Sequence, residues 1–445
     1  MPTLEELRET RIRKLNKLKE EGINPYPAKT NHIYSISTIL ENFWFWRLYK
    51  KINSVGRIKA IRVHGKAAFF DIEDDSGKIQ CFLNPSDLTN RKSYDEFVVG
   101  YDIGDFVEVS GFLFKTKKSE KTIRIKEIRM IAKSLLPLPE KWHGLKDVEE
   151  RYRKRYLDLL MNREVKEKFL KRSQIIKELR NFFDKHGFDE FETPILQAIP
   201  GGAEAQPFET RLNALNLDLY LRVAPELYLK RLLVAGFEKV YEIGRNFRNE
   251  GMDAHHNPEF TMIEAYIAYE NSDYLKKIIP DLFKYIIKKV NNGKLIVNYE
   301  DNYINFETPW QEKNYDDLAS GWDIAKKNLI QPTFVSGFPA DILPLSKTLE
   351  KHPDKADAFQ VFAGGLELIK AFTEQNDPLE QRRKFEAQRL DEDFLEALEY
   401  GMPPAAGFGL GLDRLTMLLT NSHTAREIIL FPTMKPKERD NANKA

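Results

Sequence analysis

The stretch that decides the fold is VYEIGRNFRNEGMDAHHNPEFTMIEAY, residues 240–266. It begins with strand-like residues, passes through a polar loop that contains glycine, and returns strand-like through Phe260, Met262 and Tyr266. Charged and imidazole side chains gather around the loop: Arg245, Arg248, Glu250, His255, His256, Glu259 and Glu264. Such a hairpin can direct an arginine at a phosphate and an aromatic ring at a base. A charged hairpin held by ion pairs explains the same spacing equally well.

Helices and strands follow each other irregularly on both sides of this hairpin. Apolar residues with helical spacing between Val165 and Phe183 predict a helix that ends at Gly187. The remaining segments are a proline-interrupted stretch at 188–199, strands at 217–223, 240–243, 260–268 and 407–410, and helices from Pro225 and over 413–419. Because regular βαβ units are missing, we expect an α+β domain built on an antiparallel sheet flanked by helices.

The first part of the chain has a different pattern. Residues 3–22 predict a helix with a basic face, which is either a solvated surface or a phosphate contact. Short strands separated by turn signals follow, at 56–58, 68–72, 78–82, 106–114 and 122–131. Five strands in about 80 residues predict a small Greek-key barrel of the oligonucleotide-binding (OB) type.

The composition excludes several classes of protein. The 445 residues contain 69 Lys+Arg and 68 Asp+Glu, so neither a uniformly basic nucleic-acid coat nor an acidic tail is present. The charge is divided unevenly, with a net +5 in residues 1–150 and −4 in the remainder. The single cysteine, Cys81, excludes an internal disulfide framework and indicates a reduced, cytoplasmic protein. We expect no membrane span and no secretory signal.

Common nucleotide and metal motifs are missing from the sequence. There is no G-x-x-x-x-G-K-[ST] loop and no G-x-G-x-x-G after a strand. The glycines of residues 407–411 resemble a phosphate loop only superficially, and packing explains them as well. His255 and His256 are adjacent and cannot chelate a metal as an i, i+4 pair does.

Three segments, in order along the chain, resemble the three motifs of the class II aminoacyl-tRNA synthetases. Motif 1 corresponds to FDEFETP at 188–194, motif 2 lies within 240–266 as FRNE and HNPEF, and motif 3 lies within 407–419 as GLGLDR. Further segments resemble the lysyl-tRNA synthetases: GKA at 65–67, PGGA at 200–203, APELYLK at 224–230 and REIILFPTMKP at 426–436. The resemblance implies an N-terminal helix and OB-fold anticodon-binding domain at 1–140 and a catalytic domain at 141–445.

The resemblance also implies a reaction. L-Lysine would be joined to the α-phosphate of ATP with release of pyrophosphate, and the lysyl group would then pass to the 3′ end of tRNA(Lys) during protein biosynthesis. Because the substrate carboxylate is the nucleophile, the protein needs to align the reactants and neutralise charge at phosphorus. By resemblance, Arg248 and Arg414 are the catalytic residues, and the ATP-binding set is Arg248, Glu250, His256, Asn257, Phe260, Glu367 and Arg414.

Individual roles follow from the same resemblance. Arg248 would hold the α-phosphate and the substrate carboxylate, because its planar fork matches oxyanions. Phe260 and Arg414 would stack on the two faces of adenine, Glu250 would reach its amino group, and His256 the distal phosphates. The lysine-binding set is Gly202, Glu226, Arg248, Glu264, Tyr266, Lys370, Phe372 and Glu374. Gly202 and Glu226 belong to its α-amino end, and Glu264, Tyr266, Phe372 and Glu374 to its side-chain end.

The chain departs from the family pattern at two places. Lys370 stands where an asparagine that contacts substrate is expected, next to Ile369 where glycine is expected. A cation there should repel a cationic substrate unless it points away or pairs with a carboxylate. Gln360 stands where an acidic metal ligand is expected, whereas Glu367 is retained. Since an amide binds Mg²⁺ more weakly than a carboxylate, we expect one well-held Mg²⁺ with ATP and leave further ions open. The segment 310–331 is shorter than the family insertion.

The barrel and the oligomer are also assigned by resemblance. Arg57, Phe69 and Gln80 stand where the family reads anticodon bases, by stacking and by an amide at a base edge. The run Phe43–Trp46 either covers the barrel or forms an interface. Motif 1 builds a two-fold interface in this class, which implies a homodimer. The implied partners are ATP, L-lysine and tRNA(Lys).

Two other readings remain open from the sequence. One is a paralogue that attaches a lysine-like amino acid to another acceptor, although the presence of the barrel argues against it. The other is a non-catalytic tRNA-binding relative, which the retention of Arg248, Glu250 and Arg414 argues against. The related aspartyl and asparaginyl enzymes share the architecture, but three glutamates at Glu226, Glu264 and Glu374 suit a cationic substrate better.

Overall fold

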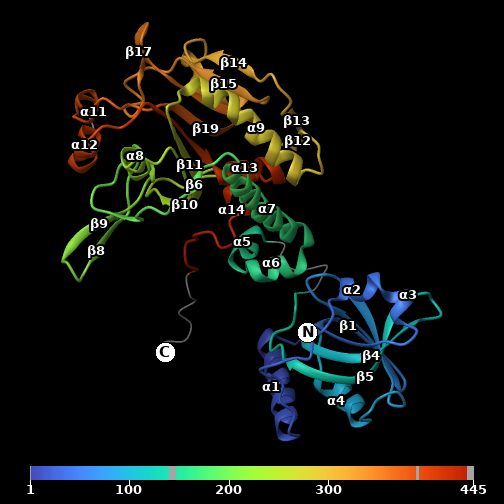
Figure 1. The fold of residues 1–445 in the computed structure, drawn as a ribbon. Coiled ribbons are helices and arrows are strands. Elements are labelled where there is room, and N and C mark those ends of the chain that lie inside the picture. The colour runs from blue at the N-terminus through green and yellow to red at the C-terminus, as the bar shows by residue number, and fades with distance from the viewer. Residues whose placement is uncertain (1, 140–146, 387–389, 438–445) are drawn as a thin grey trace. The chain divides into compact units, whose positions relative to one another are not determined.

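A computed structural model describes residues 2–139, 147–386 and 390–437. The chain forms two compact units, residues 1–144 and 145–445 (Figure 1). The boundary expected near residue 140 falls among residues outside the described ranges, so the domain limits stay a prediction. Within those ranges, no helix has the length and apolar character needed to cross a membrane.

The first unit is a closed five-stranded barrel, which confirms the predicted OB fold. The strands follow the order β1-β2-β3-β5-β4 around the barrel, and most neighbours are antiparallel. Their bounds are β1 (Lys51–His64), β2 (Ala67–Glu73), β3 (Lys78–Leu83), β4 (Phe106–Lys115) and β5 (Lys121–Ala132). The helices are α1 (Leu4–Glu20), α2 (Ile36–Glu41), α3 (Phe43–Trp46) and α4 (Lys92–Gly100).

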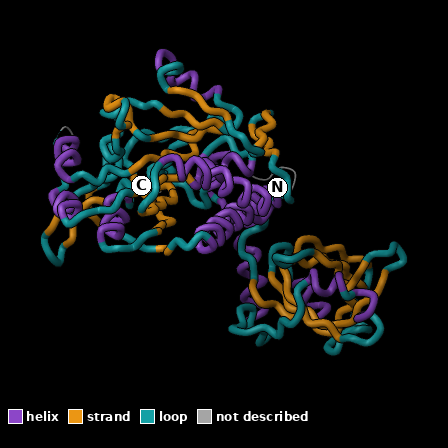
Figure 2. Tube along the Cα trace, turned by 45° about the horizontal axis from the view of Figure 1, so that its top comes forward, coloured by secondary structure: helices purple, strands orange, loops and turns teal. Residues whose placement is uncertain are grey.

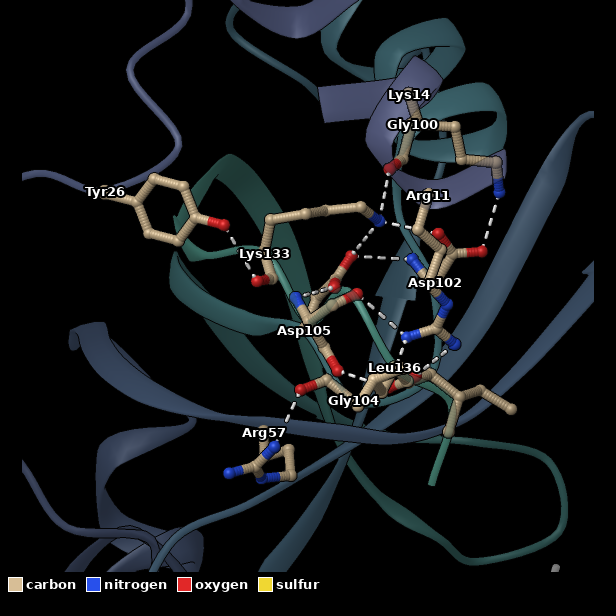
Figure 3. Close-up of polar contacts among 12 residues, drawn as sticks. Arg11, Lys14, Tyr26, Arg57, Gly100, Asp102, Gly104, Asp105, Lys133 and Leu136 are labelled. Carbon is tan, nitrogen blue, oxygen red and sulfur yellow. Dashed lines mark hydrogen bonds and ion pairs between the residues drawn. The ribbon is translucent and has the colours of Figure 1, made fainter. Parts of the chain in front are cut away.

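Helix α1 begins with a capping box between Thr3 and Glu6 and ends before Gly22, which has a φ of +77°. A buried polar network attaches the helix to the barrel (Figure 3). Lys133 Nζ pairs with Asp102 at 2.6 Å and with Asp105 at 2.8 Å. Arg11 donates to three backbone carbonyls of the barrel unit, and Lys14 pairs with Asp102. Arg11 and Lys14 of the basic helix therefore point toward the barrel, so the basic face of this helix is not simply solvated.

The aromatic run of α3 is divided between core and solvent. Phe43 is fully buried in the barrel core, whereas Trp44 and Phe45 are exposed. Lys115 lies 5.2 Å from the Trp44 ring centroid. Trp46 is partly buried against the same core, with its ring centroid 4.7 Å from that of Tyr34, so the run anchors to the barrel through Phe43 and Trp46.

The second unit is built on an eight-stranded sheet of order β14-β15-β18-β19-β20-β11-β10-β6. The six central strands are antiparallel, as predicted, and the two edge pairs, β14 with β15 and β10 with β6, are parallel. The strands are β6 (Asp189–Glu190), β10 (Lys239–Phe247), β11 (Glu259–Ala268), β14 (Gln311–Asn314), β15 (Thr333–Ser336), β18 (Ala358–Ala363), β19 (Leu366–Thr373) and β20 (Ala405–Gly411).

Helices cover one face of this sheet, as Figures 1 and 2 show. These are α7 (Arg163–Lys185), α9 (Ser272–Val290) and α13 (Leu412–Thr420). Their apolar stripes pack on the inward residues of the central strands and form the largest core cluster. Part of the opposite face packs against α8 (Glu226–Val234) and α12 (Glu392–Glu399). The rest of that face stays open and holds the site.

Shorter elements surround this framework. The helices are α5 (Val148–Arg153), α6 (Arg155–Met161), α10 (Trp322–Ala325), α11 (Pro378–Phe385) and α14 (Ala425–Ile428), with 3₁₀ turns η1 (Ala319–Gly321) and η2 (Lys326–Asn328). The strands are β7 (Leu196–Gln197), β8 (Glu209–Leu212), β9 (Leu217–Leu221), β12 (Ile296–Tyr299), β13 (Asn302–Asn305), β16 (Thr348–Leu349) and β17 (His352–Ala356). The strand predicted at 217–223 thus lies in a separate three-stranded sheet with β7 and β8.

Candidate active site

A cavity of about 790 Å³ lies on the open face of the large sheet. It collects residues that are far apart in the sequence, from residue 199 to residue 425. Most of the predicted site residues line it: Gly202, Glu226, Arg248, Glu250, His256, Asn257, Phe260, Glu264, Tyr266, Gln360, Glu367, Lys370, Phe372 and Arg414. The roles given to them by resemblance stay predictions, but the fold brings them into one place.

Strand register explains how these side chains meet. Gln360, Lys370, Gly409, Glu264 and Glu242 are successive partners across β18, β19, β20, β11 and β10. Directly paired residues present their side chains on the same face, so this row lies on the face of the cavity. The next row on the same face holds Ala358, Phe372, Gly407, Tyr266 and Val240. Two glycines, Gly407 and Gly409, stand in the middle of the rows, where neighbouring side chains approach the sheet too closely for a Cβ.

One end of the cavity carries three glutamates and one lysine, which we call the glutamate cluster: Glu226, Glu264, Glu374 and Lys230. Lys230 Nζ donates to Glu226 Oε1 at 2.7 Å and also pairs with Glu374. Burial acts against the charge of Lys230, but the two carboxylates outweigh it and raise its pKa. The cluster therefore contains more carboxyl groups than its own lysine can neutralise.

Glu226 and Glu264 are the carboxyls of this cluster that line the cavity. The Tyr266 hydroxyl donates to Glu264 Oε2 at 2.9 Å. Burial, reinforced by the neighbouring Glu226, raises the pKa of Glu264 to about 8. A carboxyl that binds its proton so tightly near neutral pH is one that a cation would stabilise in the ionised form.

The predicted place of Glu374 in the lysine site stays a prediction. The residue is fully buried, and an added Cβ at Gly407 would overlap its Oε1 and the Tyr266 ring. Burial raises the pKa of Glu374 against the attraction of Lys230. Glu374 thus lies against Gly407, which lines the cavity, and pairs with the buried Lys230.

The sequence reasoning missed Lys230. Its side chain is fully buried between Glu226 and Glu374. The i, i+4 spacing of Glu226 and Lys230 on the predicted helix was a usable signal. Its second partner, 144 residues further along the chain, could be found only from the fold.

The other end of the cavity carries arginines. The Arg248 guanidinium lies 5.1 Å from the Phe260 ring centroid, and its Nε is buried without a hydrogen-bond partner. Burial lowers the pKa of Arg248, although Glu250 and Glu264 act in the opposite direction. The unpaired N–H of this guanidinium can therefore donate a hydrogen bond to a bound oxyanion.

Arg414 is fixed at the same end. It donates to the Glu367 carbonyl and to His256 Nε2, both at 3.0 Å. Because arginine only donates, His256 carries its proton on Nδ1, which faces Asp253 at 2.8 Å. Burial opposes the charge of Asp253, but hydrogen bonds from His256 and His255 lower its pKa to about 2.

The contacts of two predicted ATP-binding residues, Glu250 and Asn257, say less about their role. Glu250 is exposed, and its Oε1 accepts only a long bond from the Gln206 backbone, at 3.4 Å. Asn257 uses its amide to donate to the Glu259 carbonyl at 2.6 Å, while its Oδ1 is buried without a partner. Asn257 therefore supports the loop and keeps one free acceptor.

Of the residues predicted to hold Mg²⁺, Glu367 fits one ion with ATP, whereas Gln360 offers only a neutral amide, and the number of further ions stays open. Glu367 and Gln360 are both half-buried, and both line the cavity. Mg²⁺ in nucleotide sites commonly takes one or two carboxylates together with phosphate oxygens and water, which Glu367 can provide. No cluster of three or more His, Cys, Asp or Glu side chains with metal-binding geometry occurs in the described part of the chain. A further ion would lack the carboxylate that Gln360 replaces.

The predicted anticodon residues lie on the barrel unit. Phe69 is half-buried and contacts Phe82, with ring centroids 4.8 Å apart. Gln80 Oε1 accepts from the Thr122 hydroxyl at 3.0 Å, which leaves its amide nitrogen for a ligand. Arg57 donates to the Gly104 carbonyl at 3.0 Å (Figure 3). Burial lowers the pKa of Arg57, so this residue is in part structural.

Comparison with known proteins agrees with this geometry. Residues 147–435 match the family described as tRNA synthetases class II (D, K and N), and residues 53–131 match the OB-fold nucleic acid binding domain. A lysine–tRNA ligase of Syntrophomonas wolfei is 43% identical, with 98% of each chain covered. Those of Clostridium tetani and Carboxydothermus hydrogenoformans are both 44% identical, covering 97% and 98% of this chain and 96% and 99% of theirs. The chain therefore belongs to the lysine–tRNA ligase family of the class II aminoacyl-tRNA synthetases.

Proposed function

We propose that this chain activates L-lysine with ATP and transfers the lysyl group to the 3′ end of tRNA(Lys). The observation that supports this most strongly is the polarity of the cavity. The glutamate cluster, with its excess of carboxyl groups, occupies one end, and Arg248 and Arg414 occupy the other. A molecule with an ammonium group at one end and a carboxylate at the other matches this polarity.

Strand geometry supports the same orientation. Glu264 and Phe260 are four residues apart on β11. At about 3.3 Å per residue, their backbones are separated by roughly 13 Å. An extended lysine spans about half of that distance, so its carboxylate would lie between Glu264 and the adenine-stacking ring of Phe260. The α-phosphate of ATP would then meet the carboxylate near Arg248.

The residues would act by alignment and charge neutralisation. A lysine carboxylate oxygen attacks the α-phosphorus, and the bond to the pyrophosphate oxygen breaks. Arg248 would bind the carboxylate and the α-phosphate, and Arg414 with Phe260 would clamp adenine. None of these three side chains transfers a proton, because the substrate carboxylate that attacks is already ionised. His256, held by Asp253 and Arg414, would orient toward the distal phosphates.

One Mg²⁺ would accompany ATP. When bound, such an ion neutralises phosphate charge and helps pyrophosphate leave. Glu367 is the residue that would hold it. The Glu367 carbonyl also fixes Arg414, so the metal and the adenine clamp would share one anchor on β19.

Recognition of the tRNA would involve the barrel. Phe69 offers a half-exposed ring for stacking, and Gln80 offers an amide donor for a base edge. Arg57 would contribute one of its remaining N–H groups. OB-fold barrels bind single-stranded nucleic acid on such a surface.

A homodimer and a cytoplasmic location complete the proposal. Motif 1 carries exposed apolar residues directly after it, Ile195 and Leu196, 44% and 47% exposed. Such residues favour an interface through this segment. The one cysteine, Cys81, is a buried free thiol, as in proteins of a reducing compartment.

The test is ATP–pyrophosphate exchange with lysine, ornithine, arginine, aspartate and asparagine as alternative amino acids. Lysine is expected to drive exchange, with ornithine at least tenfold weaker because its shorter chain leaves Glu264 without a close partner. Exchange driven by another amino acid would indicate a paralogue with altered identity. No exchange with any of them, in an intact dimer with Mg²⁺, would contradict the proposal.

A further inference from the structure

The two departures from the family pattern lie directly opposite each other. Gln360 on β18 and Lys370 on β19 are cross-strand partners, and both line the cavity. Lys370 is exposed, and none of the described residues forms an ion pair or hydrogen bond with its ammonium group. Gln360 Oε1 is buried without a hydrogen-bond partner. Two unpaired polar groups thus meet the cavity side by side.

Lys370 is separated from Glu374 along β19 and from Glu264 across the sheet. Glu374 lies four residues beyond Lys370, which is roughly 13 Å along an extended chain. Glu367 lies three residues before it, at the arginine end. Across the sheet, Lys370 is level with Glu264 but two strands away, with Gly409 between them, which is roughly 10 Å. A substrate ammonium held by Glu264 would therefore leave the substrate carboxylate on the side of Lys370, where it would meet the α-phosphate.

The neighbouring strand β20 contributes no side chain next to Lys370. The partner of Lys370 on β20 is Gly409, which has no side chain to cover the ammonium. An added Cβ at Gly409 would come within 2.9 Å of Met262 Cε, so the glycine is required for packing as well. The next residue of the row is Glu264, whose carboxyl is engaged by Tyr266.

Charge is conserved if the two departures are considered together. A carboxylate at position 360, a neutral asparagine at 370 and a divalent cation would sum to +1. Gln360 and Lys370 without that cation also sum to +1. Moreover, a carboxylate at 360 would pair with Lys370 across the strands and neutralise it, whereas the neutral Gln360 leaves it free. The two departures therefore compensate each other in charge.

We propose that the Lys370 ammonium binds oxyanions at the reacting centre in place of a second metal ion, a proposal that rests on the proposed function. It would contact the lysine carboxylate and an α-phosphate oxygen as the carboxylate–phosphorus bond forms and the bond to pyrophosphate breaks. No proton moves, because the ammonium acts by its charge and its hydrogen bonds. This explains how a cation is tolerated beside a cationic substrate.

Four variants test the proposal. Lys370→Met removes the charge, and Lys313→Met on the exposed edge strand β14 is the matched control. Gln360→Glu should neutralise Lys370, and Gln360→Glu combined with Lys370→Asn restores the family pattern. Binding of AMP, whose phosphate corresponds to the α-phosphate of ATP, is measured by calorimetry at a fixed low Mg²⁺ concentration. Lysine-dependent exchange is then measured against Mg²⁺ concentration, and melting temperatures report folding.

The expected results are specific. Lys370→Met should weaken AMP binding about tenfold and lower kcat/KM for lysine about 100-fold, as for loss of one donor at a developing charge. Gln360→Glu should resemble it, and the double variant should regain activity with a steeper dependence on Mg²⁺. Lys313→Met should stay within twofold of the parent.

Two results would overturn the proposal. One is a Lys370→Met variant that behaves like Lys313→Met in both assays. The other is tighter lysine binding by Lys370→Met, which would place the ammonium against the substrate ammonium. If the parent chain shows no lysine-dependent exchange, the proposed function fails, and the AMP titration still decides whether Lys370 binds a phosphate oxyanion.

Discussion

Binding of lysine should release a proton from Glu264. In the free protein, burial and Glu226 raise the pKa of Glu264 to about 8, so this carboxyl is mostly protonated at pH 7. The substrate ammonium would favour the ionised form, as an opposite charge at close range does. The perturbation is therefore a change of pH, and the response is the affinity for lysine.

The magnitude follows from the ionised fraction. With a pKa of about 8, Glu264 is ionised in roughly a tenth of free molecules at pH 7 and in roughly a hundredth at pH 6. If only the ionised form accepts the ammonium, the apparent Kd for lysine should fall roughly 50-fold between pH 6 and pH 8. About 0.9 proton should be released per lysine bound at pH 7.

Calorimetric titration with lysine in two buffers of different ionisation enthalpy measures both quantities. The control is Glu264→Gln, which cannot ionise and should bind lysine weakly and with little dependence on pH. A Kd that is constant between pH 6 and pH 8, with no difference between the buffers, would refute the reasoning. A proton release retained in Glu264→Gln would assign the effect to another group.

The same shift predicts a stability effect with a defined sign. Because the pKa of Glu264 is higher in the folded protein than in the unfolded chain, this carboxyl contributes fully to stability at a pH below its pKa in the unfolded chain. The contribution is lost as the pH rises through about 8. Saturating lysine should offset that loss. The increase in Tm on adding lysine should therefore be larger at pH 8 than at pH 6.

Three further predictions concern packing and RNA binding. Gly407→Ala should abolish lysine-dependent exchange while leaving ATP binding within about threefold, because the new methyl group overlaps the Tyr266 ring; unchanged exchange would contradict this. Lys133→Met should destabilise the barrel by about 3–5 kcal/mol in urea unfolding of the intact chain, since Asp105 would lose its buried partner; a loss below about 1 kcal/mol would be inconsistent. Phe69→Ala should raise KM for tRNA about tenfold or more and leave pyrophosphate exchange unchanged, and an effect on exchange instead would exclude a role confined to stacking.

The general architecture was predictable because its signals are local. The hairpin of residues 240–266 combines strand-like ends with a polar loop, and it forms β10 and β11 as expected. The helix expected between Val165 and Phe183 is the core of α7. Barrel strands are recognisable from short apolar runs between turn residues, and all five form. Such patterns depend on residues that are close in the sequence, so the helices and strands that they indicate can be predicted without knowing the fold.

The arrangement within the site was less predictable because it depends on register. The pairing of Gln360 with Lys370 depends on a register shift between Val361 and Phe362. No sequence pattern predicted this shift. The burial of Glu374 depends on Gly407 of another strand. These relations join segments separated by tens of residues, and only the folded sheet defines them.

Arg57 illustrates the remaining difficulty. A cation on a predicted nucleic-acid surface suggests contact with RNA, yet its guanidinium lies 4.1 Å from the Phe106 ring centroid and bonds to Gly104. Sequence alone does not reveal how many of the five N–H groups of an arginine the fold itself uses.

The central claim is that this cavity selects lysine for attachment to tRNA. The most direct measurement gives the protein a total tRNA pool, ATP, Mg²⁺ and all twenty amino acids together. Nuclease digestion then releases the charged 3′-terminal adenosine, which mass spectrometry identifies. The account predicts lysyl-adenosine as the only product that depends on the protein. A different aminoacyl-adenosine, or none while lysine-dependent pyrophosphate exchange proceeds, would contradict it.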